Sequence, residues 1–115
     1  MLSNASTKKS LARRVKLASS AWQRFKGLMF EKRQDFALVF PFPAPTRLGA
    51  SIHTFFMHHA IDVVYLDSRK RVQEFHFKVK PWLLNLSPLH PASFLIELPA
   101  GSLKGKVKKG DELKW

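Results

Sequence analysis

Two acidic residues stand where an apolar strand would not accept an unpaired charge. Asp62 and Glu97 each follow an isoleucine and precede a branched aliphatic residue. Burying a carboxylate is costly unless it is paired or hydrogen-bonded, so we expect Asp62 to be held by His53, His59 or Arg24, or by backbone N–H groups. Two carboxyl groups near strand ends could act as a general acid and a general base. We favour the alternative, in which each one ties a loop to the strands through hydrogen bonds.

Three histidines precede Asp62. His53 and His59 share a strand face only if the strand between them is unbroken, and His58 then faces the other way. Zinc needs three or four converging ligands, and these spacings match no ligand motif. We therefore expect polar side chains at a break between strands, with neither a metal nor another cofactor.

The loop that begins at Pro81 and runs to Pro91 carries a second unusual residue, Trp82. An aromatic side chain in a long loop can stack on a ligand, cover the end of a barrel or fill a gap in the core. Polar residues embedded in apolar sequence need one another as partners, so we expect five residues to gather around one concavity. The five candidate ligand-binding residues are His53, His59, Asp62, Trp82 and Glu97.

Short β-rich runs dominate the chain around these positions. The prolines at 41–45 lack N–H donors and should end the strand before them. A capping box at Ser20 and Gln23 predicts a helix from 21 to about 28, and residues 102–107 can add one short helical turn. The fold class is therefore a β-dominated α+β domain, a compact and partly open β-barrel with one or two short helices. Strands are predicted at 15–17, 36–40, 51–57, 61–66, 72–79, 94–98 and 112–115.

The net charge of +12 is concentrated at the two ends of the chain. Residues 1–10 are polar and lack an apolar period, so we expect a disordered basic leader before a single domain at 11–115. A basic arm attracts polyanions through counterion release, so weak, non-specific binding of nucleic acid is the alternative function. The same arm could serve only to keep the protein in solution. The cations concerned are Lys8, Lys9, Arg13, Arg14 and Lys16.

Composition limits the compartment and the chemistry. The chain has no Cys, which removes disulfides, thiolate zinc sites and cysteine nucleophiles together. No apolar run reaches the length of a signal peptide or of a membrane span, so we expect a cytoplasmic protein without a transmembrane segment. The string GSLKGK at 101–106 is one residue short of a phosphate loop and does not predict nucleotide hydrolysis.

Several motifs follow one another in the order of a known family. They are RFKGLM at 24–29, IHTFFM at 52–57, IDVVYLD at 61–67, PW at 81–82, LIELPAG at 95–101 and GD at 110–111. Over about 15–113 the chain resembles domain of unknown function family 192, and the resemblance implies a small β-rich α+β barrel with no assigned activity. The chain departs from the family pattern at Ala60, Lys70 and Leu83, where members commonly have Pro, Gly and Arg. The last departure removes a cation from the long loop and argues against an anion site there.

The polar residues near strand ends favour a binding module over an enzyme. Its cleft would lie at one end of the barrel, bounded by the break at 58–59, the loop at 81–91 and the turn after Glu97. The expected partner is a small molecule or a protein. Hydrolase-type chemistry through Asp62, Glu97 and a histidine is the interpretation we favour least.

Overall fold

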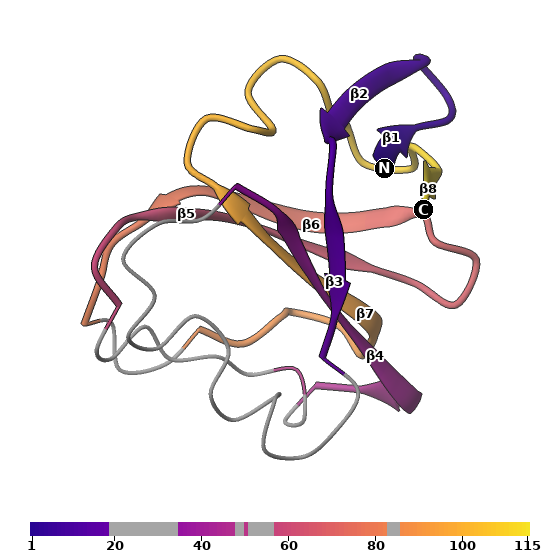
Figure 1. Ribbon diagram of the computed structural model, residues 1–115. Coiled ribbons are helices and arrows are strands. Elements are labelled where there is room, and N and C mark those ends of the chain that lie inside the picture. Colours follow the sequence, from indigo (N-terminus) through magenta and orange to yellow (C-terminus); the bar gives the residue numbers. More distant parts are fainter. Residues whose placement is uncertain (19–34, 48–49, 51–56, 83–85) are drawn as a thin grey trace.

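The structure is a computed structural model that describes residues 1–18, 35–47, 50, 57–82 and 86–115. Within these ranges the strands are β1 (Leu2–Asn4), β2 (Lys9–Ala12), β3 (Val15–Leu17), β4 (Ala37–Thr46), β5 (Ile61–Leu66), β6 (Val72–Val79), β7 (Ala92–Pro99) and β8 (Leu113–Lys114). They pair into a three-stranded sheet of order β2-β1-β8 and a five-stranded sheet of order β3-β4-β7-β5-β6 (Figure 1). The fold of the described residues is therefore β-dominated, as predicted.

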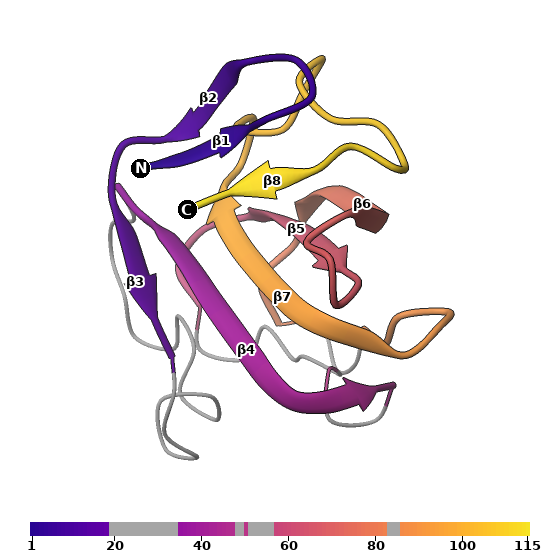
Figure 2. The ribbon, with the colours of Figure 1, turned by 90° about the vertical axis from the view of Figure 1, so that its right-hand side faces the viewer.

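A partly open barrel is not confirmed. β3 and β6 form the two edges of the five-stranded sheet, and the described residues do not join those edges. The three-stranded sheet lies above β4 and β7 as a separate layer (Figure 2). Because β1 pairs with β8, the first and last strands of the chain lie side by side.

Helices are absent from the described residues, and the helix predicted at 21–28 lies outside them. The helical turn predicted at 102–107 is wrong: the segment forms separate turns, in which Ser102 N donates to Pro99 O at 3.1 Å and Lys106 N donates to Leu103 O at 2.9 Å. Gly101 and Gly105 adopt left-handed φ values of 93° and 70°, which interrupt a right-handed helix. Within the described ranges there is no helix long and apolar enough to span a membrane.

The five-stranded sheet is covered on both faces. β5 is buried at all its positions, which requires packing on each side of the sheet. On one face Val64, Ile96 and Leu98 pack with Leu2 and Leu113 of the three-stranded sheet. The other face forms a second core from Val63, Tyr65, Leu95, Phe36 and Phe40. Because the two cores lie on opposite faces of the sheet, only polar side chains on the same face can contact one another.

Residues 1–10 differ from the disordered leader that we predicted. Leu2 and Asn4 are fully buried, and β1 pairs with both β2 and β8. The Asn4 Nδ2 donates to Lys106 O and to Asp111 Oδ2, both at 2.8 Å, so the start of the chain is fixed to its end. A three-residue strand is too short to show a period, which is why its apolar anchor at Leu2 was missed.

The prolines at 41–45 do not end their strand, and β4 continues to Thr46. β3 pairs with β4 only at Ala37 to Val39, so the prolines lie beyond the reach of β3. Among the described residues no strand pairs with that side of β4 beyond Val39, so the prolines break no described ladder there.

Candidate functional site

Asp62 is fully buried, and three backbone amides satisfy its carboxylate. Its Oδ1 accepts from Lys78 N, and its Oδ2 accepts from Gly101 N and Leu103 N, each at 3.0 Å. From the sequence we expected either a basic side chain or backbone N–H groups as partners of Asp62. The structure shows backbone N–H groups. Asp62 ties the end of β6 to the turns that follow β7.

A bulge explains why the Lys78 amide is available. The pairing of β5 with β6 shifts register between Ile61 and Val63, and Lys78 adopts a left-handed φ of 51°. Bulged residues leave the regular ladder and need another partner for their N–H group. The Asp62 carboxylate supplies that partner.

Glu97 lies on the opposite face of the same sheet. In β5 and β7 the direct partners are Asp62 with Leu98 and Val63 with Glu97, and direct partners point to the same side. Leu98 belongs to the first core and Val63 to the second. A single concavity that contains both carboxyl groups is therefore inconsistent with the register.

Burial controls the ionisation of Glu97. The side chain is 3% exposed, and loss of hydration raises the pKa of its carboxyl group from 4.5 to about 8. At neutral pH the group is largely protonated, so it can both donate and accept a hydrogen bond.

Three polar side chains share the side of the sheet occupied by Glu97. Tyr65 pairs with Glu74, and Val63 pairs with both His76 and Glu97. The His76 Nε2 lies 2.5 Å from Glu74 Oε2, and the His76 ring meets the Tyr65 ring edge-on at 6.4 Å between centroids. We call the set Glu97, Tyr65, Glu74 and His76 the Glu97 face.

The Tyr65 phenol is fully buried. Burial, followed by the negative charges of Glu74 and Glu97, raises the pKa of Tyr65, so the phenol stays protonated at physiological pH. Its hydroxyl donates to Leu86 O at 3.3 Å, and Leu89 N donates to Glu74 Oε1 at 2.9 Å. These bonds fix the end of the 81–91 loop against the Glu97 face.

The sequence prediction missed Tyr65, Glu74 and His76. The alternation along 72–79 places Glu74 and His76 on one side of the strand, and that signal was available. Phe75, on the other side of the strand, packs against the first core, and Phe77 is 48% exposed.

The other predicted residues lie at one end of the sheet or outside the described ranges. Ile61 pairs with Val79 and with Pro99, so the segments that contain His59 and Trp82 flank the same edge. The His59 Nδ1 lies 3.2 Å from Ala60 O, and its buried Nε2 meets no hydrogen-bond partner within the described ranges. Trp82 is 59% exposed, so it does not fill the core. His53 lies outside the described residues.

The five cations of the predicted basic arm belong to an ordered segment. Lys9 lies in β2, where its Nζ donates to Gly105 O at 3.2 Å. Arg14 pairs with Asp35 at 3.2 Å, and the Lys16 ammonium lies 4.0 Å from the centre of the Phe36 ring. They therefore do not form a free tail. In the described part of the chain, no three His, Asp or Glu side chains converge where they could hold a metal ion.

Comparison with known proteins identifies relatives across the whole chain. The family model DUF192, described as Uncharacterized ACR, matches residues 3–115. The UPF0127 protein TK1120 of Thermococcus kodakarensis is 43% identical over 116 residues, which cover 100% of this chain and 73% of that protein. The UPF0127 protein PH1112 of Pyrococcus horikoshii is 44% identical over 117 residues, which cover 100% of this chain and 98% of that protein.

Two solved structures share the fold. A protein of unknown function from Novosphingobium aromaticivorans has a TM-score of 0.78 at 21% identity, over 88% of this chain and 74% of that one. A Sinorhizobium meliloti protein, provisionally described as a transcription regulator, has a TM-score of 0.80 at 24% identity, over 87% of this chain and 79% of that one. At these identities the likeness concerns the fold alone.

Proposed function

The chain belongs to the DUF192 family of uncharacterised proteins, as its motif order predicted, and on that premise we propose that it is a binding module for a small polar ligand on the Glu97 face. The observation that carries the proposal is the burial of the Glu97 carboxyl group beside the Tyr65 phenol, at the loop that Leu86 and Leu89 anchor. Buried titratable groups whose pKa is strongly shifted occur preferentially at functional sites.

The chemistry of the Glu97 face selects among ligands. A protonated Glu97 supplies a donor and an acceptor, whereas Glu74, next to His76, supplies carboxylate oxygens. An anionic ligand would meet Glu74 and would oppose any ionisation of Glu97. The face therefore suits an uncharged polar molecule or an amine.

The other residues predicted from the sequence have different places in this proposal. His59 has a buried Nε2 that lacks a partner among the described residues, and Trp82 is exposed at the same end of the sheet. We keep His59 and Trp82 as rim residues and assign Asp62 to the fold. His53 stays a prediction, as does a cytoplasmic location.

The two alternative functions, hydrolase-type catalysis and nucleic-acid binding, have less support than the binding module. An acid and base pair made of Asp62 and Glu97 would need both groups on one side of the sheet, and the register separates them. The nucleic-acid alternative required a flexible basic arm, but these cations belong to an ordered segment. They are Lys8, Lys9, Arg13, Arg14 and Lys16. A partner protein is a further alternative for the exposed Trp82.

Fluorescence of Trp82 tests the proposal directly. In a Trp22→Phe, Trp115→Phe background, Trp82 is the sole tryptophan, and we would titrate the protein with urea-sized amides, short diamines and acetate. We expect saturable shifts in emission with amides or amines that are lost in Glu97→Ala and kept in Glu112→Ala, since Glu112 is exposed. Glu97→Gln, of nearly the same size, controls for misfolding. Probe binding that survives in Glu97→Ala, or no binding across the panel, would refute the assignment.

A further inference from the structure

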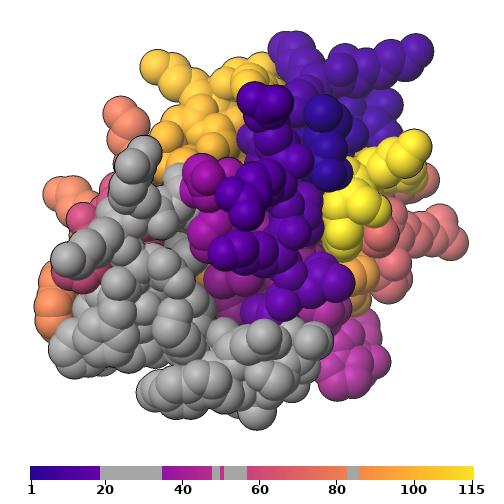
Figure 3. Space-filling model, viewed as in Figure 1, coloured from indigo at the N-terminus to yellow at the C-terminus, as the bar shows by residue number. Residues whose placement is uncertain are grey.

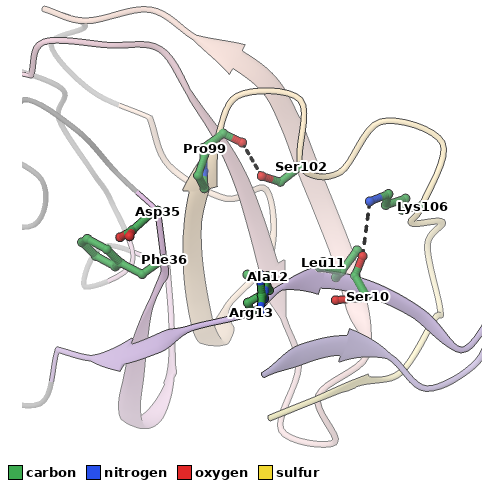
Figure 4. Close-up of a pocket in the computed structure, with 9 residues that line it drawn as sticks. All are labelled: Ser10, Leu11, Ala12, Arg13, Asp35, Phe36, Pro99, Ser102 and Lys106. Carbon is green, nitrogen blue, oxygen red and sulfur yellow. Dashed lines mark hydrogen bonds between the residues drawn. The ribbon is translucent and has the colours of Figure 1, made fainter.

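A groove of about 320 Å³ opens where the N-terminal segment meets the turns after β7 (Figure 4). Its walls come from the end of β2 and Arg13, from Asp35 and Phe36 ahead of β4, and from Pro99, Ser102 and Lys106. The volume falls at the lower end of the range of small-molecule sites. None of its lining residues belongs to the Glu97 face, so this site is independent of the proposed function.

Two cations of the groove are free to meet an anion. Arg13 is exposed and has no carboxylate within ion-pair distance among the residues that the structure describes. Lys106 is half-buried, and its Nζ donates to the neutral carbonyl of Ser10 at 3.3 Å. A phosphate group would give Lys106 a stronger, charge-assisted partner than a carbonyl.

The groove has opposite polarity at its two sides. Figure 4 shows Asp35 on one side and Lys106 on the other, with Ala12 and Arg13 between them. Arg14 pairs with Asp35 at 3.2 Å, but both side chains are largely exposed, at 64% and 74%, so the Asp35 carboxylate can still accept further hydrogen bonds. Carboxylates commonly recognise the hydroxyl groups of sugars in this way.

We propose that this groove binds a phosphate monoester of a polyhydroxy compound, such as a sugar phosphate. The phosphate lies against Arg13 and Lys106, because the guanidinium fork matches phosphate oxygens and the ammonium adds charge. The hydroxyl groups reach toward Asp35, and Leu11, Phe36 and Pro99 supply apolar lining.

Asp35 also disfavours a nucleic-acid strand as the occupant. A strand presents one phosphate after another, and a phosphate that follows the one at Lys106 along the groove would approach the Asp35 carboxylate. Figure 3 shows the N-terminal segment, in indigo and violet, at the surface beside the gold residues that follow β7. The lining residues Arg13 and Asp35 are exposed, so a small molecule can approach the groove from solvent.

Calorimetric titration with ribose 5-phosphate, ribose and inorganic phosphate tests the proposal. We expect ribose 5-phosphate to bind more tightly than either fragment, and the double variant Arg13→Gln, Lys106→Gln to weaken its binding by about tenfold or more. The matched control is Lys109→Gln, which removes an exposed cation outside the groove and should leave the affinity unchanged.

Asp35→Asn separates a sugar-phosphate site from a general anion site. The change should weaken ribose 5-phosphate by a few-fold while leaving inorganic phosphate bound equally or more tightly, because a negative charge has been removed. If Asp35→Asn raised the affinity for ribose 5-phosphate and for inorganic phosphate equally, the proposed role of Asp35 would be wrong.

A short oligodeoxythymidylate is the last ligand to be tested. The proposal predicts that it competes poorly with ribose 5-phosphate. Effective competition, together with an equal loss of oligonucleotide affinity in Lys109→Gln and in the groove variants, would show a general polyanion surface and refute the site. Absence of any ribose 5-phosphate binding would refute it as well.

Discussion

Asp62 and Glu97 occupy neighbouring strands one register step apart, yet the fold surrounds these two carboxyl groups very differently. Three backbone amides at 3.0 Å hold Asp62, and they come from two separate segments of the chain. Glu97 lies on the other side of the sheet, where burial is the dominant influence and raises its pKa to about 8. Equal burial therefore does not mean equal surroundings: Asp62 organises the backbone through three amides, whereas burial raises the pKa of Glu97.

The largest expected effect is the loss of the Asp62 carboxylate. Asp62→Ala leaves the amides of Lys78, Gly101 and Leu103 without their acceptor, and we expect it to lower the free energy of unfolding by about 3 to 5 kcal/mol. Chemical denaturation measures the change. The control is Asp67→Ala, which removes an acceptor for two amides in an exposed turn and should cost about 1 kcal/mol. Equal costs at the two positions would contradict the special role of Asp62.

The second effect is a pH dependence that belongs to Glu97. Between pH 4.5 and about 8 the folded protein retains a proton that the unfolded chain has lost, so the free energy of unfolding falls as the pH rises and levels off above that range. We expect Glu97 to account for a fall of up to about 5 kcal/mol. Glu97→Gln removes the titration at nearly constant size, so denaturation of both proteins from pH 4 to 9 isolates this contribution. Parallel pH curves would exclude the raised pKa.

A smaller effect concerns the anchor of the loop to the Glu97 face. Tyr65→Phe removes the hydrogen bond to Leu86 O and should destabilise the protein by about 1 kcal/mol. The Leu89 amide, which donates to Glu74, should also exchange its hydrogen faster because the loop is held less firmly. Unchanged exchange at Leu89 would mean that the Tyr65 bond does not hold the loop.

The smallest effect is expected at the bulge beside Asp62. Lys78 has a φ of 51°, so Lys78→Gly relieves a left-handed conformation and should stabilise the protein by about 0.5 to 1 kcal/mol. Lys114→Gly, at an exposed strand position without such a φ, should destabilise it. Thermal unfolding distinguishes the two signs, and destabilisation by both changes would contradict the bulge geometry.

Much of the strand arrangement could be predicted from the sequence. The predicted bounds of β5 and β6 match the structure, because each strand has β-rich residues between clear turn signals. The prediction that Asp62 ties a loop to the strands by hydrogen bonds is confirmed, since a carboxylate in such an apolar strand requires fixed partners.

The grouping of the site could not be predicted in the same way. Position near a strand end follows from sequence, but the face on which a side chain lies depends on the register of the paired strands. That register separates Asp62 from Glu97, and it places Glu74 opposite Tyr65 and His76 opposite Val63. The N-terminal strand was missed for another reason, because its stability comes from pairing with β8 at the far end of the chain.

The most direct test of the contrast between the two carboxyl groups is an NMR titration of the Glu97 carboxyl carbon, assigned by its disappearance in Glu97→Gln. We predict a midpoint near pH 8, with the protonated form dominant at neutral pH. A midpoint near 4.5, the ordinary value for glutamic acid, would show that burial does not control this group and would contradict the assignment of the Glu97 face as the binding site.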